Sequence, residues 1–286
     1  MQQIIEYWQS QGFEVQRFEF SNADHIQELF KEILKRHTDP DRLGVIVAAG
    51  GDGTLNAVAS QLCHLDIPMG ILPLGTFNYV ARLLKIPLDL NAAAEVIAQG
   101  QPREVHVGCI NDRIYLNNAS LGLYPLFIRK REEYNQKFGR FPLHAYTSGL
   151  DVLLRDRKAL KLEVAVDQQR YRIKTPLVFF GNNQLQLAEM KLKVAKCAEI
   201  GQVVGVVMAK SDKLTLFKAL FQLIKGDLEH AADVYSFSAE QVMVYSKKAS
   251  LTVAIDGEIV ELATPLKIRV EKNALKIMVP YADSSV

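Results

Sequence analysis

The sequence predicts an α/β N-terminal domain with a mainly parallel sheet, followed by a β-rich, sandwich-like C-terminal domain. Up to Gly100, apolar strand-like runs alternate with helical patterns, as in a parallel sheet covered by helices. From Glu104 onward, short runs of alternating hydrophobicity dominate, which is typical of strands with one buried face. We therefore expect one domain over residues 1–104, completed by a C-terminal return at 272–286, and a second over 105–271.

The composition excludes several classes of protein. With 286 residues, 49% hydrophobic and 23% charged, the chain is globular rather than disordered or fibrous. A net charge of +2 and a pI of about 8.3 do not indicate a nucleic-acid partner. Cys63, Cys109 and Cys197 lie far apart, so neither a zinc site nor a disulfide framework is expected.

The N-terminal region indicates where the protein acts. The three scattered cysteines favour a reducing cytoplasm, and neither a signal peptide nor an apolar run long enough for a membrane span is found. Ile4, Ile5 and Trp8 predict a helix that ends at Gly12, followed by a strand over residues 13–18. A second helix is expected from Ser21 to Lys35, with Ser21 or Asn22 as its cap.

The central feature of the sequence is the glycine turn Gly50-Gly51-Asp52-Gly53-Thr54-Leu55-Asn56. It follows an apolar run and precedes a helical pattern carried by Leu55, Val58, Ala59 and Leu62. Glycines let backbone N–H groups approach a phosphate closely, and the helix adds its positive dipole end. Asp52 fits such a turn when it meets a divalent cation or a ribose hydroxyl, although it could equally cap the helix.

A second turn of this kind follows the next predicted strand, Ile67–Leu72. Its residues are Gly75-Thr76-Phe77-Asn78, ahead of a helix from Val80 to Leu84. Because ligands of parallel sheets bind at the carboxyl ends of strands, both turns are candidate binding sites. Thr76 and Asn78 offer a hydroxyl and an amide, but Asn is also common in turns for backbone reasons alone.

The C-terminal half is predicted to end in a hairpin and two closing strands. Asp256-Gly257 between alternating apolar runs favours a tight turn. Two further strands are expected at Leu266–Val270 and Leu275–Val279.

These motifs together resemble a known family. Gly50 to Asn56 resembles the nucleotide-binding signature of diacylglycerol kinases, sphingosine kinases and NAD kinases. Leu72-Pro73-Leu74-Gly75-Thr76-Phe77-Asn78 resembles the second signature of bacterial diacylglycerol kinase-like lipid kinases. The resemblance implies an ATP- and Mg²⁺-dependent lipid kinase, with a nucleotide-binding first domain, a lipid-binding second domain and an active site between them.

The same resemblance implies roles for particular residues. Nucleotide contact would fall to Gly50, Gly51, Asp52, Gly53, Thr54, Asn56, Gly75, Thr76, Asn78 and, more weakly, Ser21. Asp52 would meet Mg²⁺ through the nucleotide. Asp256 or Glu258 would be the general base, and the sequence does not decide between them.

The chain departs from the family pattern at three points. The family's first strand and its Asn-Pro-x-Ser-Gly loop have no match, and Tyr79 replaces an expected Asp. Ala198-Glu199-Ile200-Gly201 stands where relatives carry Leu-Asp-Asp-Gly, so a structural metal is expected to be absent. A non-catalytic nucleotide- or lipid-binding relative is therefore an alternative, and an NAD kinase a less favoured one.

The expected substrate is a diacylglycerol-like lipid, which the enzyme would meet at the inner face of the membrane. Peripheral contact could involve the basic residues Arg129-Lys130-Arg131 or the apolar helix Leu214–Ile224. A solvated face and a core helix are the ordinary interpretations of these two stretches. The oligomeric state is not indicated.

Overall fold

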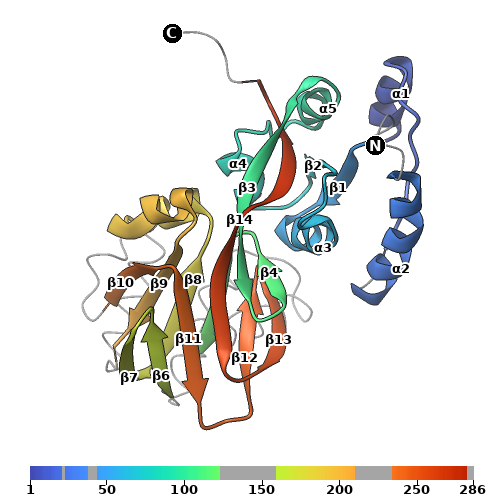
Figure 1. Cartoon of the computed structure of the whole chain (residues 1–286). Helices are drawn as coiled ribbons and strands as arrows, with labels where there is room; N and C mark the ends of the chain where they lie inside the picture. The colour runs from blue at the N-terminus through green and yellow to red at the C-terminus, as the bar shows by residue number, and fades with distance from the viewer. Residues whose placement is uncertain (21–22, 38–43, 123–158, 210–233, 282–286) are drawn as a thin grey trace, which may run out of the picture. The chain divides into compact units, whose positions relative to one another are not determined.

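A computed structural model describes residues 1–20, 23–37, 44–122, 159–209 and 234–281. The chain divides into two compact units, Met1–His106 with Lys272–Val286, and Val107–Glu271 (Figure 1). The strands β3 (Gln101–Ile110) and β14 (Leu266–Val279) contain residues of both units. Ser21 and the segments 129–131 and 214–224 lie outside the described residues.

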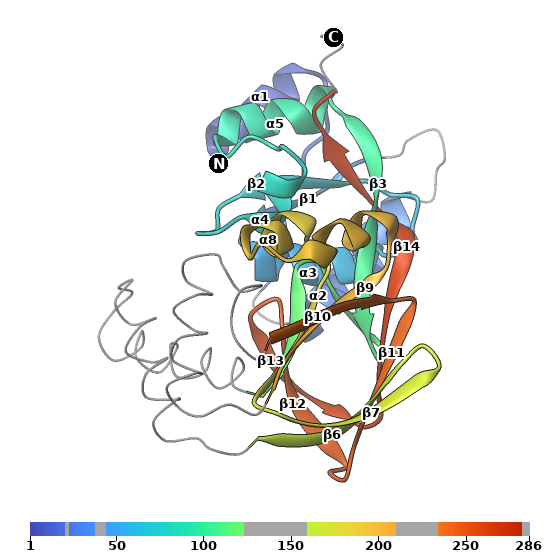
Figure 2. The same ribbon diagram turned by 90° about the vertical axis from the view of Figure 1, so that its left-hand side faces the viewer.

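The first unit is an α/β structure, as predicted. Its strands β1 (Ile46–Gly50) and β2 (Met69–Pro73) are parallel, and Ile277 of β14 pairs in parallel with Met69. Figures 1 and 2 show α3 and α5 on opposite sides of β1 and β2. Its helices are α1 (Gln2–Ser10), α2 (Ala23–Leu34), a 3-10 turn (Lys35–His37), α3 (Asp52–Leu62), α4 (Tyr79–Leu83) and α5 (Leu90–Gln99).

The N-terminal helix ends where the sequence indicated, but the strand predicted after it is wrong. Gly12 has φ of +89°, and the N–H groups of Gly12 and Phe13 donate to the carbonyls of Gln9 and Trp8. This is the Schellman ending that glycine favours. Residues 13–20 form no strand, and Phe13 and Phe18 are 47% and 37% exposed. Alternating apolar residues predict a strand only where another strand and a core lie beside them.

The second unit is formed mainly by two antiparallel sheets. In one, β11 (Gln241–Ser246) pairs with β14 and β6 (Leu160–Val166), and β7 (Gln169–Thr175) pairs with β6. The other has the order β10-β9-β8-β5-β12-β13. Its strands are β5 (Asn118–Gly122), β8 (Leu177–Gly181), β9 (Val203–Met208), β10 (Val234–Ala239), β12 (Ser250–Ile255) and β13 (Glu258–Ala263). The described part of this unit also contains the short β4 (Arg113–Tyr115), α8 (Gln184–Glu189) and a 3-10 segment (Lys193–Ile200).

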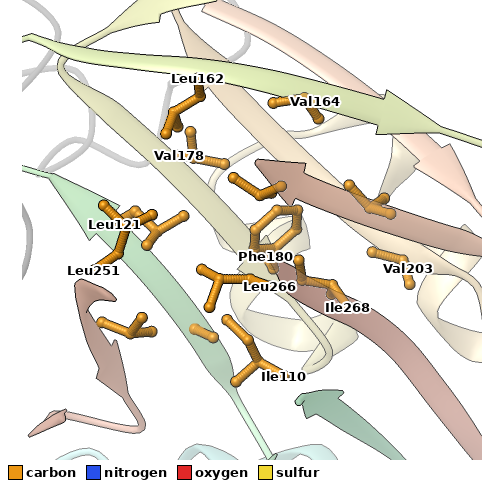
Figure 3. Packing of buried hydrophobic residues seen from close by; sticks show 14 of the residues in the cluster. Ile110, Leu121, Leu162, Val164, Val178, Phe180, Val203, Leu251, Leu266 and Ile268 are labelled. Carbon is orange, nitrogen blue, oxygen red and sulfur yellow. The ribbon is translucent and has the colours of Figure 1, made fainter. Parts of the chain in front are cut away.

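One hydrophobic core joins the two sheets. Leu162, Val164 and Ile268 from one sheet pack in the same cluster as Leu121 and Phe180 from the other (Figure 3). This confirms the sandwich-like C-terminal region. Both predicted closing ranges are strand, but the break expected between them is wrong, because β14 continues from Leu266 to Val279 through Asn273, which has φ of +55°. In the sequence, the polar residues around Asn273 look like a break between two strands, but the strand continues through them.

Candidate active site

The first glycine turn joins the carboxyl end of β1 to the start of α3. Gly51 is the N-cap of the helix, and no side chain caps it by a hydrogen bond. The apolar face is buried as predicted, with Leu55, Val58, Ala59 and Leu62 at most 5% exposed. The first N–H groups of a helix have no intrahelical acceptor, so this end offers donors to an anion.

The two glycine turns touch each other. Gly50 lies opposite Pro73 in the parallel pair, and the N–H of Leu74 donates to the carbonyl of Gly50 at 3.0 Å. A Cβ placed on Gly75 would lie 2.6 Å from the Cα of Gly51. The absence of a side chain at these positions is therefore a packing requirement as well as a feature of the motif.

Gly53 differs from the other glycines of the turn. Apart from its chain neighbours and the backbone of its own helix, no atom lies within 4 Å of the position that its Cβ would occupy. The space in front of the first turn of α3 is open on this side. An open, uncapped helix start of this kind fits a phosphate group.

Asn78 is held by its own turn. It has φ of +49° and is 5% exposed. Its Oδ1 accepts from the N–H of Gly75 at 3.0 Å, and its Nδ2 donates to the carbonyl of Gly75 at 2.8 Å. The backbone explanation for this residue is thus confirmed, and nucleotide contact stays a prediction. Thr76, by contrast, is exposed.

Asp52 connects the first turn to the helix after the second. Its Oδ2 and Oδ1 lie 3.4 Å from the backbone nitrogens of Tyr79 and Val80, which donate to them. These residues begin α4, so the carboxylate lies at the positive end of that helix. Both bonds are long, and the oxygens retain capacity to accept from a ligand or to bind a cation.

We expect Asp52→Ala to separate these two roles of Asp52. Loss of the two long N–H contacts should lower the free energy of unfolding by about 1 kcal/mol, the scale of a lost helix cap. A larger fall in nucleotide binding would show that the carboxylate also serves the ligand. Chemical denaturation and ATP titration measure the two effects, and Asp89→Ala, which removes the cap of α5, is the matched control. Equal loss of ATP binding in both variants would contradict the ligand role.

An aromatic pair follows the second turn. The rings of Phe77 and Tyr79 stack with centroids 5.8 Å apart and planes 10° apart. The guanidinium of Arg82 lies 5.5 Å from the centroid of the Tyr79 ring. Phe77 is 55% exposed, so it presents an aromatic surface beside Thr76. The sequence pattern gave no sign of this arrangement.

The second unit places the two candidate bases in different surroundings. Asp256 and Gly257 form a two-residue turn with φ of +45° and +92°, and Ile255 pairs with Glu258. This confirms the predicted hairpin, with the positive φ values of a type I′ turn. The Asp256 carboxylate accepts from the N–H groups of Leu116 at 2.7 Å and of Asn117 and Asn118 at 2.9 Å. Glu258 is exposed at the start of β13.

A buried amide network supports the segment that holds Asp256. Asn183 Nδ2 donates to Asn117 Oδ1 at 2.9 Å, and Asn118 Nδ2 donates to Gln186 Oε1 at 2.9 Å. All four amide side chains are at most 7% exposed. Gln186 on α8 carried no signal in the sequence.

Tyr115 lies close to this network and is fully buried. Burial raises the pKa of its phenol well above the ordinary value, with smaller contributions from Cys109 and Asp256. The Tyr115 side chain therefore remains a neutral phenol. Gly108, opposite it on β3, leaves room for the ring, since a Cβ there would lie 2.2 Å from it.

Metal ligands are sparse in the part of the chain that the structure describes. No group of three or more His, Cys, Asp or Glu side chains in those residues could hold an ion. Glu199 is exposed in the 3-10 segment.

Comparison with known proteins points to one family. Residues 1–110 match the diacylglycerol kinase catalytic domain. A diacylglycerol kinase of Staphylococcus aureus is 28% identical over 218 residues, covering 75% of this chain and 68% of that protein. An uncharacterised protein of Synechocystis is 23% identical over 277 residues, and the aligned region spans 62% of its length. The crystal structure of a diacylglycerol kinase from Bacillus anthracis superimposes with a TM-score of 0.66 at 20% identity, covering 94% of this chain and 85% of that one. This likeness confirms the fold.

Proposed function

Through residues 1–110 the chain belongs to the diacylglycerol kinase catalytic domain family, and from this premise we propose that it is an ATP-dependent lipid kinase. The observation that carries the proposal is the pair of glycine turns at neighbouring strand ends, with Gly51 and Gly75 in contact and the start of α3 uncapped. Phosphoryl transfer requires a protein mainly to hold a triphosphate and to orient an acceptor. The two glycine turns and the start of α3 offer backbone groups that can hold the triphosphate.

In the proposed complex, the first turn of α3 and the Gly50–Gly53 turn bind phosphate oxygens through backbone N–H groups. Mg²⁺, when bound with the nucleotide, would neutralise phosphate charge, and Asp52 is the carboxylate placed to meet it. Thr76 and Asn78 would lie at the nucleoside end, where the exposed ring of Phe77 offers a stacking surface for the base.

We expect Phe77→Ala to raise the KM for ATP several-fold and to change kcat less, because stacking on a base contributes about 1–3 kcal/mol. Steady-state kinetics with ATP measure this change. Leu74→Ala removes a comparably exposed apolar side chain from the same connection and is the control. Equal kinetics for Phe77→Ala and the wild type would place the base elsewhere.

In the second unit, Asp256 is the proposed general base that takes the proton from the lipid hydroxyl. Three backbone N–H groups fix the carboxylate in place. A carboxylate held in this way is oriented before substrate binds. The acceptor is a diacylglycerol-like lipid, as in the name of the S. aureus relative.

The test is transfer of labelled γ-phosphate from Mg-ATP into a bacterial lipid extract by the wild type, Asp52→Ala and Asp256→Asn. Labelled lipid that is lost in both variants would support the kinase and identify its acceptor. Labelling of NAD instead of lipid would favour the NAD kinase alternative. ATP or lipid binding without transfer, by a folded wild type, would favour a non-catalytic relative.

A further inference from the structure

The sheet formed by β14, β11, β6 and β7 has an apolar inner face and a charged outer face. Leu162, Val164, Val244 and Ile268 point into the core of the second unit. The residues that alternate with them point outward, since successive side chains of a strand face opposite sides. The register places Arg172 opposite Glu163, Lys174 opposite Lys161, and Met243 opposite Lys267.

This outer face is strongly basic. Its six cationic residues and two acidic residues give a net charge of +4, whereas the whole chain carries only +2. The remainder of the chain is therefore net negative. We call this surface the basic sheet face; it consists of Lys161, Glu163, Arg170, Arg172, Lys174, Lys267, Arg269 and Glu271.

A single carboxylate, that of Glu163, lies within ion-pair distance of both Arg170 and Arg172. Glu163 lies 3.0 Å from Arg170 and 3.5 Å from Arg172, whose side chains are 65% and 91% exposed. Arg269 is only 35% exposed and is held within the protein, because its Nε donates to Glu271 at 2.6 Å and its Nη1 donates to the carbonyl of Asn111 at 3.1 Å. Exposed ion pairs are weak, so the guanidinium groups of Arg170 and Arg172 remain able to interact with an external anion.

The centre of the face is less polar than its margins. Met243 and Tyr245 on β11 are half-buried and lie between the basic residues of β6 and β7 on one side and of β14 on the other. The guanidinium of Arg170 lies 5.4 Å from the centroid of the Tyr245 ring. An amphipathic aromatic ring among basic side chains suits a boundary between lipid and water.

We propose that the basic sheet face docks the protein on a bilayer that contains anionic phospholipids. Strands lie about 4.8 Å apart and alternate residues about 6.8 Å apart, so the cations form a broad array rather than converging on one phosphate. Such an array matches the many phosphates of a membrane surface, which attracts each basic residue that lies near it. The lipid acceptor of the proposed function supplies the reason for this contact, and the inference rests on that function to this extent.

The experiment is co-sedimentation of the full chain with vesicles of phosphatidylcholine, either alone or with about 30% phosphatidylglycerol, a composition at which the surface attraction stays measurable despite Debye screening. The test variant reverses two exposed charges on β7, Arg172→Glu with Lys174→Glu. The matched control reverses two exposed charges of the 3-10 segment in the same unit, Lys193→Glu with Lys196→Glu. Circular dichroism and thermal unfolding establish that both variants are folded.

We expect the wild type to bind only the anionic vesicles, more weakly as salt increases. The β7 variant should lose at least about tenfold in partition coefficient, since each reversal replaces an attraction to the anionic surface by a repulsion. The control should match the wild type within about twofold, because a charge far from the contact is screened. Equal losses in the two variants, or none in either, would overturn the proposal.

Two further measurements test whether the basic sheet face binds DNA or single phosphate ions instead of a membrane. Duplex DNA that binds more tightly than the vesicles and is lost in the β7 variant would overturn the assignment to lipid. So would release by inorganic phosphate far beyond that by chloride at equal ionic strength, which would indicate a site for single phosphate ions. Vesicle binding through this face by a wild type that transfers no phosphate would leave the docking surface standing and remove the proposed function.

Discussion

Asp256→Asn is expected to reduce phosphoryl transfer by about two to four orders of magnitude, the contribution of a general base. The substitution keeps the size of the side chain and removes its charge and basicity. It also replaces one acceptor oxygen by an NH₂ group that would face a backbone N–H donor. The loss of stability is smallest when the NH₂ group takes the place of the oxygen that accepts fewer hydrogen bonds. Oδ1 accepts from two residues, Asn117 and Asn118, whereas Oδ2 accepts from Leu116.

The structural part of this effect is separable from the catalytic part. Leaving the buried N–H of Leu116 without an acceptor should lower the free energy of unfolding by about 1–3 kcal/mol. Denaturant unfolding measures this loss, and single-turnover transfer on the folded fraction measures the chemical step. Residual activity that scales only with the folded fraction would show that Asp256 is a structural residue.

Glu258→Gln is the matched control for this prediction. Glu258 is exposed and lies two positions from Asp256, and its replacement by Gln removes only the charge. We expect its kcat to fall less than threefold, a change of under about 0.7 kcal/mol. If Glu258→Gln loses transfer and Asp256→Asn loses only stability, the base is Glu258, and Asp256 is the residue that holds the turn against β5.

Local rules of sequence were sufficient for the parts of the fold that depend on near neighbours. Asp256-Gly257 predicted its hairpin because both residues tolerate positive φ. The stripe from Leu55 to Leu62 predicted the buried face of α3 for a similarly local reason. The strand expected over residues 13–18 failed because strands depend on partners that lie elsewhere in the chain.

The site itself depends on contacts that no local pattern reports. Asp256 is held by Leu116, 140 residues earlier in the chain, and Asp52 reaches Tyr79, 27 residues later. The sequence could mark these residues as candidates but could not assign their hydrogen bonds. Asn78 shows the opposite case, because its amide bonds only to Gly75, three residues away, and the turn preference of asparagine already accounts for it.

The two glycine turns provide a test that separates folding from phosphate binding. A methyl group at Gly75 would lie 2.6 Å from the Cα of Gly51 and 2.7 Å from Asn78 Oδ1, so Gly75→Ala must displace backbone. We expect it to lower the free energy of unfolding by about 1–3 kcal/mol, the scale of overpacking. ATP binding should weaken with it, because the two turns move apart.

Gly53→Ala, unlike Gly75→Ala, should affect the binding of ATP without lowering the stability of the protein. Its methyl group meets no atom within 4 Å, and alanine favours a helix over glycine, so the protein should unfold at the same temperature or higher. Cβ atoms of a helix lean toward its N-terminus, which places this methyl in the open space before the first N–H groups of α3. If a phosphate of ATP occupies that space, Gly53→Ala should weaken ATP binding at least about tenfold, or about 1.4 kcal/mol, without loss of stability.

Calorimetric titration with ATP and thermal unfolding measure the two quantities on one sample. Unchanged affinity in a stable Gly53→Ala protein would mean that the helix start does not bind phosphate, and the nucleotide would have to be held by other residues.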